Sequence, residues 1–195
     1  MPILGIMASQ ASAHLWAPGK DFDSIATTTV STAVSSITFS SIPSTYRHLQ
    51  IRLFAQTNRG TYGRDSLKMI FNSDSGANYA DHALYGDGGS AGAGASVSNT
   101  YMGIGTIGTS AVLSSLMFGV RVIDVLDYAN ISKYKTVRSI GGLDMNGTGT
   151  GGIGGLVDLN SGLWQSTTAV NSITFAPAVG TTFNQYTSAA LYGVK

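Results

Sequence analysis

The feature that most constrains this chain is an alternation of apolar and polar residues over positions 47–57. The residues of one parity are apolar and most of the other are polar, namely Leu49, Ile51, Leu53 and Ala55 against Gln50, Arg52 and Gln56. Successive side chains of a β-strand point to opposite faces, so the segment is predicted to be a strand with one buried face. A helix would need apolar residues at spacings of three and four, which the segment lacks.

The use of charged residues favours an all-β chain that takes part in an assembly. All 10 acidic residues are Asp. Glu favours helices whereas Asp favours turns and caps, so the absence of Glu argues against helices. Charged residues make up 11% of the chain, against roughly 25% in typical soluble domains. A surface this poor in charge tends to associate. We therefore expect a subunit that buries surface in a larger assembly, with a soluble monomer whose surface is Ser, Thr, Asn and Gly as the alternative.

Composition also excludes several classes of partner and site. The chain has no cysteine, which rules out disulfides and thiolate metal sites. Its net charge of +1 gives no reason to expect nucleic acid or an anionic membrane as a partner. The apolar stretch at 1–7 is too short to span a bilayer, so no membrane insertion is expected. No motif calls for a cofactor.

The chain divides into an N-terminal arm at 1–19 and one β-sandwich domain at 20–195. The arm has no clear period, and its large apolar residues are Ile3, Leu4, Ile6, Leu15 and Trp16. We expect these residues to dock onto a neighbouring subunit of the assembly. The alternative is that the arm covers an edge of its own domain's core.

Short alternating segments separated by turn residues predict about ten strands. They lie at 22–30, 35–39, 47–57, 66–72, 79–85, 99–107, 113–128, 134–140, 156–164, 170–175 and 185–194. The glycine-rich stretch 86–94 is expected to be a flexible excursion, and 141–155 a long loop or a pair of weak strands. Many short strands with regular turns and no helix predict an antiparallel β-sandwich, with a jelly roll as the first choice.

The segment 113–128 changes parity along its length. Val120 and Val122 are taken as core residues with Arg121 opposite them, after which Ile123 takes the other parity. A change of parity without a turn predicts a bulge near 122–124, because a bulge moves side chains to the other face.

Two tetrapeptides occur twice. Ser-Ile-Thr-Phe is found at 36–39 and 172–175, and Ala-Leu-Tyr-Gly at 83–86 and 190–193. Such repeats could fill equivalent positions in two sheets, but they are too short to prove duplication, and coincidence among β-rich segments is the preferred explanation.

No catalytic constellation is present. The histidines are far apart, and the nucleophile elbow, the P-loop and the dinucleotide fingerprint are all absent. Asp124 and Asp127 are more plausible as a bulge cap and a turn than as a glycosidase pair. The stretch 72–76 resembles the start of a calcium loop, but position 12 is Ala83 where a Glu is needed, so a turn is expected. Trp16 and Trp164 fit a core or interface better than a sugar platform.

The chain resembles a family of small structural proteins of tailed-bacteriophage virions. Seven phrases carry the resemblance, namely Met-Pro-Ile-Leu-Gly-Ile at 1–6, Phe-Asp-Ser-Ile-Ala-Thr at 22–27, Ile-Thr-Phe-Ser-Ser-Ile-Pro-Ser-Thr-Tyr at 37–46, His-Leu-Gln-Ile-Arg at 48–52, Phe-Asn-Ser-Asp-Ser-Gly-Ala-Asn-Tyr at 71–79, Ser-Gly-Leu-Trp at 161–164 and Ala-Leu-Tyr-Gly-Val-Lys at 190–195. The resemblance implies a subunit at the tail or on the head surface, and it transfers no catalytic residue.

These observations lead to the expectation of a non-enzymatic virion protein at the particle surface. In the first placement it is tail- or fibre-associated and presents loops to a host-surface glycan. In the alternative it is a capsid decoration (cement) protein that clamps neighbouring capsid subunits. Self-association, as a trimer by analogy with other virion proteins, is expected alongside contacts with those proteins.

Receptor contacts are expected on three connections, at 58–64, 86–98 and 144–152. Tyr62 and Arg64 are the best single candidates, because an aromatic face and a forked donor suit sugar rings and carboxylates. The alternative for Arg64 is an ion pair with Asp65 or with an acidic residue of a neighbouring subunit.

Overall fold

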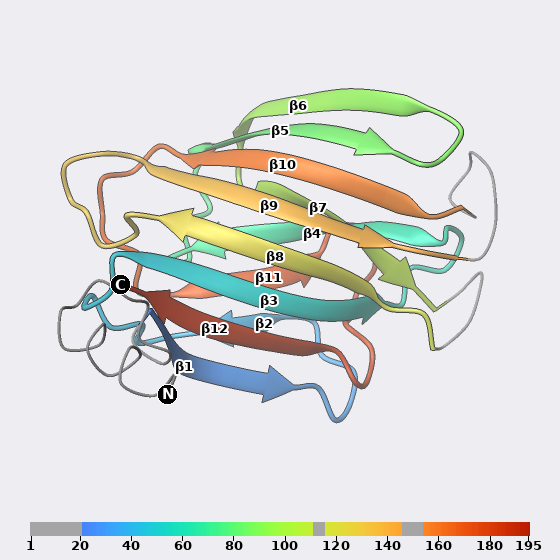
Figure 1. Cartoon of the computed structure of the whole chain (residues 1–195), viewed down its shortest axis with the longest axis horizontal. Helices are drawn as coiled ribbons and strands as arrows, with labels where there is room; N and C mark the ends of the chain where they lie inside the picture. The colour runs from blue at the N-terminus through green and yellow to red at the C-terminus, as the bar shows by residue number, and fades with distance from the viewer. Residues whose placement is uncertain (1–20, 111–115, 146–153) are drawn as a thin grey trace, which may run out of the picture.

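The structure is a computed structural model that describes residues 21–110, 116–145 and 154–195. The described residues form twelve β-strands and no helix (Figure 1). The strands are β1 Phe22–Thr29, β2 Ile37–Phe39, β3 His48–Thr57, β4 Arg64–Phe71, β5 Tyr79–Gly86, β6 Ala91–Asn99, β7 Met102–Thr109, β8 Gly119–Leu126, β9 Lys135–Leu143, β10 Leu156–Trp164, β11 Ile173–Pro177 and β12 Ser188–Val194. Each segment predicted as a strand overlaps one of these strands.

The strands form two antiparallel layers (Figure 1). The larger sheet has the order β1-β12-β3-β8-β9-β10-β5-β6, and the smaller has the order β2-β11-β4-β7. The layers meet where the end of β3 pairs in parallel with the end of β7, at Gln56–Gly108 and Thr57–Thr109. The predicted all-β sandwich is therefore confirmed.

Eight of the strands have the order of a jelly roll. If the hairpins β5–β6 and β9–β10 are left out and the remaining strands are numbered along the chain, one sheet reads 1-8-3-6 and the other 2-7-4-5. This is the order that two interlocked Greek keys produce. The two hairpins extend the larger sheet beyond β8. Strand β7, the last strand of the smaller sheet, packs on β9, β10 and β5. The larger sheet therefore extends beyond the edge of the smaller one.

The core lies between the layers, and β3 follows the predicted alternation. Leu49, Ile51 and Ala55 are fully buried, whereas Arg52 and Phe54 lie on the outer face. On that face Phe54 stacks on Phe118, with ring centroids 4.7 Å apart, so this outward aromatic residue packs against a neighbouring ring.

The bulge predicted at 122–124 is absent, and the faces predicted for Val120, Arg121 and Val122 are reversed, whereas Ile123 is buried. Its pairing with β3 and β9 is continuous through Val122 and Asp124. Val122 lies on the outer face, whereas Arg121 is 1% exposed and points into the sandwich. The prediction was wrong because it assumed that the valines, and not the arginine, would be buried.

The strand β6 was not predicted, since 86–94 was expected to be a flexible excursion. Ala and Gly alternate along β6, and two small residue types give no visible contrast of polarity. Gly92 is required by packing, because a Cβ there would lie 2.5 Å from the ring and hydroxyl of Tyr85 on β5. Pairing with β5 along the whole hairpin makes this stretch a strand.

The repeated tetrapeptides do not occupy equivalent positions in two sheets. Ser-Ile-Thr-Phe occurs on β2 and β11, which are paired neighbours in the smaller sheet, and the hydroxyls of Thr38 and Thr174 lie 3.0 Å apart. Ala-Leu-Tyr-Gly occurs on β5 and β12 of the larger sheet, with opposite faces buried: Leu191 is fully buried, whereas Leu84 is 60% exposed.

An exposed apolar row crosses the outer face of the extended sheet. Its members pair side by side on β8, β9, β10 and β5, and they are Val122, Ile140, Leu159 and Leu84. Their exposed fractions are 37%, 54%, 45% and 60%. We call these four residues the outer apolar row.

Candidate functional site

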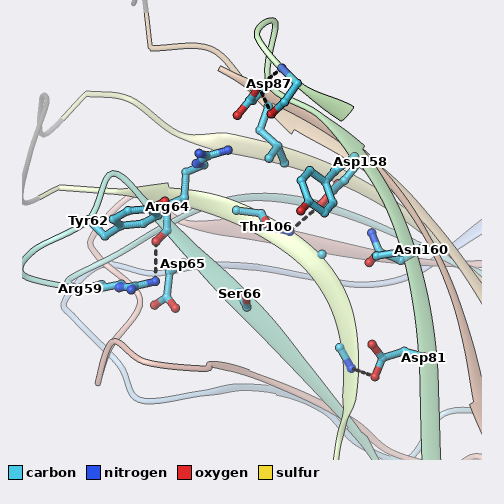
Figure 2. A pocket seen from close by; sticks show the side chains of 16 residues that line it. Arg59, Tyr62, Arg64, Asp65, Ser66, Asp81, Asp87, Thr106, Asp158 and Asn160 are labelled. Carbon is cyan, nitrogen blue, oxygen red and sulfur yellow. Dashed lines mark hydrogen bonds between the residues drawn. The ribbon is translucent and has the colours of Figure 1, made fainter. Parts of the chain in front are cut away.

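A cavity of about 500 Å³ lies under the extended part of the larger sheet. Its walls come from β4, β5, β7 and β10, together with the connection between β3 and β4. Arg59, Tyr62 and Arg64 lie on one side of the cavity, with Asp158, Asn160 and Asp81 on the other (Figure 2). The cavity exists because β10 and β5 project past the smaller sheet, which leaves part of their inner face uncovered.

A buried ion pair forms part of the cavity wall. The guanidinium of Arg121 on β8 contacts the carboxylate of Asp158 on β10. The other oxygen of Asp158 accepts a hydrogen bond from the Thr106 backbone N–H at 2.9 Å, which ties β7 to the extended sheet. Arg121 also donates to the carbonyl of Ile104 and, at 3.2 Å, to the hydroxyl of Ser139.

Burial lowers the pKa of the arginine in this ion pair. Loss of water around the guanidinium lowers the pKa of Arg121 to about 9. The group still carries its charge at neutral pH, and the carboxylate of Asp158 supplies the opposite charge that a buried arginine requires. Both oxygens of Asp158 are therefore occupied by groups of the protein.

Asn160 places an unsatisfied amide at the cavity. The residue is 5% exposed, and its Nδ2 atom has no hydrogen-bond partner among the described residues. Its neighbour across the β10–β5 pair is Ala83, whose methyl group leaves space and offers no acceptor. A buried donor without an acceptor costs free energy, so this amide is available to a ligand.

Asp81 adds a carboxyl group on the same wall. One of its oxygens accepts a hydrogen bond from the Gly103 backbone N–H at 3.2 Å. Burial raises the pKa of Asp81, and this hydrogen bond opposes that effect. The neighbouring residue on β10 is Gly162, so the carboxyl group is not crowded by a side chain there.

Tyr62 and Arg64, the residues predicted for receptor binding, both line this cavity. The Tyr62 ring lies between two cations, with the guanidinium carbons of Arg59 and Arg64 at 4.8 and 5.8 Å from the ring centre. Arg59 donates a hydrogen bond of 2.9 Å to the backbone carbonyl of Arg64, while its Nε atom is buried without a partner (Figure 2).

The ion pair between Arg64 and Asp65 that was an alternative does not form. The carboxylate of Asp65 accepts hydrogen bonds from the hydroxyl of Thr57 and from the backbone N–H groups of Val179 and Gly180, at 2.9, 3.2 and 2.9 Å. Asp65 therefore fixes the 179–180 turn. Arg64 is 8% exposed and makes no ion pair with any described residue.

The other candidates from the sequence fall outside the cavity. Trp164 is 2% exposed and packs against Phe71 and Tyr79 in the core, so it offers no sugar platform. Asp124 accepts hydrogen bonds from Gln50 and Arg138 on the outer face, and Asp127 pairs with Lys133. No cluster of metal-ligating side chains occurs in the described residues.

Several candidates lie in or beside the undescribed segments. The docking residues Ile3, Leu4, Ile6, Leu15 and Trp16 are outside the described residues, as is most of the connection at 144–152. The connection expected at 86–98 is largely strand β6, which leaves 87–90 as its turn. Asp87 holds that turn through the backbone N–H groups of Gly89 and Ser90.

The inner-face members of the site were missed by sequence reasoning. Asp158 and Asn160 have the same parity as the buried Leu156 and Trp164 of β10, and that shared parity is the signal that could have found them. Asp81 and Tyr85 carry no comparable signal, because β5 is only half-buried along its length.

Comparisons with known proteins add no assignment: no family model matches the chain, and no curated protein matches it either. Within the described residues, no helix has the length and apolar character needed to cross a membrane.

Proposed function

We propose that this chain is a non-enzymatic structural subunit of a tailed-bacteriophage particle, tail- or fibre-associated, that attaches the particle to a host-surface saccharide through the cavity. The observation that carries the proposal is the composition of the cavity: two tyrosine rings, two arginines and an unsatisfied amide around about 500 Å³. Aromatic faces with a few convergent polar groups suit sugar rings and their hydroxyls. Jelly rolls occur among viral capsid and lectin domains, which is support by analogy only.

The state of the carboxylates favours binding over hydrolysis. A glycosidase needs two carboxyl groups free to act on the substrate as acid and as base or nucleophile. Both oxygens of Asp158 are engaged, one by Arg121 and the other by Thr106. Asp65 and Asp87 also line the cavity, but Asp65 is engaged by Thr57 and the 179–180 turn, and Asp87 holds the 87–90 turn. Asp81 is then the remaining carboxyl group on the wall of Asp158, where it fits a hydroxyl-binding role.

The outer apolar row supports membership of an assembly. Four large aliphatic side chains lie exposed on four adjacent strands, in a chain with 11% charged residues. Exposed contiguous apolar surface of this kind marks an interaction face. We expect self-association, with a trimer as the state suggested by other virion proteins.

The proposal is tested with phage that carry Tyr62→Ala and Arg64→Ala together. Particles are expected to assemble normally and to adsorb to host cells at least tenfold more slowly. The matched control replaces Tyr134 and Arg47 by Ala, because both are exposed and lie outside the cavity. Normal adsorption of particles that lack the whole protein would contradict the proposal.

Capsid decoration is the second candidate, and the outer apolar row is the observation that favours it. A clamp between capsid subunits needs an apolar face more than it needs a cavity. The two placements differ in the number of copies in each particle, which quantitative mass spectrometry of purified virions measures. Hundreds of copies indicate decoration of the head, whereas a few to tens indicate the tail.

A further inference from the structure

The most unusual group in the cavity is the guanidinium of Arg64. The residue is 8% exposed, yet no carboxylate lies within ion-pair distance of it among the described residues. Its guanidinium lies beside the Tyr62 ring, whose centre is 5.8 Å from the guanidinium carbon. Buried charges in proteins are normally paired, because burial removes the water that stabilises them.

Two acidic residues that line the same cavity, Asp65 and Asp87, already have partners of their own. Asp65 uses both oxygens on the 179–180 turn and on Thr57. Asp87 is bound by the backbone of its own turn, and Arg64 is the smallest of the influences that lower its pKa. Arg121 shows the contrast within the same fold, since it is also buried, at 1% exposed, and is met directly by Asp158.

The groups across the cavity suit a sugar. The unsatisfied Nδ2 of Asn160 is a donor, and Asp81 has an oxygen that is not used by Gly103. An amide donor beside a carboxyl acceptor is the usual way to bind sugar hydroxyls, each of which both donates and accepts. The rings of Tyr62 and Tyr85 provide flat apolar faces for the sugar ring.

We infer that the cavity selects an acidic saccharide, with a ring carboxylate of the ligand bound by Arg64 and its hydroxyls bound by Asn160 and Asp81. This inference rests on the proposed saccharide-binding function and adds the charge of the ligand. Arginine is suited to the task because its planar fork binds a carboxylate through two parallel hydrogen bonds. The ligand carboxylate would form the ion pair that Arg64 does not make with any described residue of the protein.

The test measures binding of matched acidic and neutral probes to the purified full chain by calorimetry. The pairs are trigalacturonic acid with galactotriose and 3′-sialyllactose with lactose. At least one acidic probe is expected to bind tenfold or more tightly than its neutral partner, and Arg64→Gln is expected to abolish that preference. Arg64→Lys keeps the positive charge but loses the planar fork, so this variant is expected to retain only part of the preference for the acidic probe.

Arg52→Gln is the matched control. Arg52 lies over the Tyr192 ring with the guanidinium carbon 5.0 Å from the ring centre, so it repeats the contact of Arg64 with Tyr62 outside the cavity. This control is expected to bind every probe as the wild type does. If Arg64→Gln does not fold, the comparison of acidic and neutral probes on the wild type still decides the matter.

The outcomes separate the inference from the function on which it rests. Equal binding of acidic and neutral probes, lost in Asn160→Leu, would overturn the acidic preference and leave saccharide binding standing. Displacement of the acidic probe by acetate at equal concentration would show a simple anion site and overturn the inference. Absence of binding by all four probes, together with normal adsorption of the Tyr62→Ala, Arg64→Ala phage, would overturn both.

Discussion

Arg121 reaches Asp158 by passing over Gly141. The three residues are in one row across β8, β9 and β10, with Gly141 paired to Arg121 on one side and to Asp158 on the other. Because Gly141 has no side chain, the guanidinium can cross β9 and meet the carboxylate two strands away. Gly105 on β7 closes the arrangement from the opposite layer, since a Cβ there would overlap the guanidinium.

Removing one member of the pair is expected to destabilise the fold strongly. Arg121→Met and Asp158→Leu each leave an uncompensated buried charge, at a cost of about 3–5 kcal/mol in the free energy of unfolding. The double variant removes both charges and is expected to be more stable than either single variant. Urea denaturation of the four proteins measures this cycle, and additive effects of the two substitutions would contradict a direct pair.

Gly141→Ala is expected to disturb the same pair without changing a charge. The new Cβ would lie 2.5 Å from the Val120 carbonyl oxygen and 2.8 Å from the Arg121 Nε, so the guanidinium must move. Overpacking of this kind costs about 1–3 kcal/mol. Gly94→Ala is the control, because nothing lies within 4 Å of a Cβ at that strand position. Equal denaturation midpoints for the two variants would show that Gly141 is not needed as a passage.

Asp74 is expected to stabilise the 72–78 turn in a pH-dependent way. Its carboxylate accepts hydrogen bonds from the Trp164 indole at 2.7 Å and from the Gly76 backbone N–H at 2.8 Å. The indole hydrogen bond is the main reason that the pKa of Asp74 is lowered. The unfolded chain therefore takes up this proton first as the pH falls. The stabilisation is present above pH 3.8 and is lost as the pH falls through the lowered pKa of the folded state.

Two variants measure this contribution. Asp74→Ala is expected to lower the free energy of unfolding by about 1–3 kcal/mol at pH 7 and to flatten its dependence on pH below 4. Ser75→Ala, at an exposed position of the same turn, is expected to leave both unchanged. The measurement is guanidinium denaturation at a series of pH values, and an unchanged acid limb in Asp74→Ala would count against the assignment.

Sequence patterns predicted the strands of this protein better than the faces those strands present. The alternation of β3 identified both its strand and its buried side. On β8 the same reasoning predicted that Val122 is buried and Arg121 exposed, whereas in the structure Arg121 is buried and Val122 is exposed. The reversal depends on Gly141 and Gly105, which are distant along the chain and which only the folded topology places beside Arg121.

The repeated tetrapeptide Ala-Leu-Tyr-Gly makes the same point. Its leucine is core in β12 and solvent-exposed in β5. Identical local sequence therefore carries no information about which face is covered, because coverage is decided by the opposite layer. β12 lies over the smaller sheet, whereas β5 belongs to the extension beyond it.

The sequence could predict only those residues of the candidate site that lie close together along the chain. Tyr62 and Arg64 stand out in a connection between apolar strands, and the structure places both at the cavity. Asp81 and Asn160 could not be predicted, because they become neighbours only through the pairing of β5 with β10. The absence of an anion beside Arg64 likewise follows from the engagement of Asp65 with the 179–180 turn.

The outer apolar row is expected to be the face through which copies associate. Leu159 lies in the middle of the row, between Ile140 and Leu84 on the neighbouring strands. Leu159→Lys would place a charge at the centre of an apolar contact, where it would have to lose its water without gaining a partner. The wild-type protein is expected to scatter light as a homo-oligomer, and Leu159→Lys as a monomer with an unchanged denaturation midpoint.

Ile131→Lys is the control for this prediction. Ile131 is 74% exposed and lies outside the row, in the connection between β8 and β9. A lysine there adds the same charge and the same solubility to the protein, so a general effect of charge would dissociate both variants equally. Dissociation of Leu159→Lys alone assigns the contact to the row, because only that lysine meets the partner surface. A wild-type protein that remains monomeric at high micromolar concentration would remove self-association from the proposal and leave a different protein as the expected partner of this face.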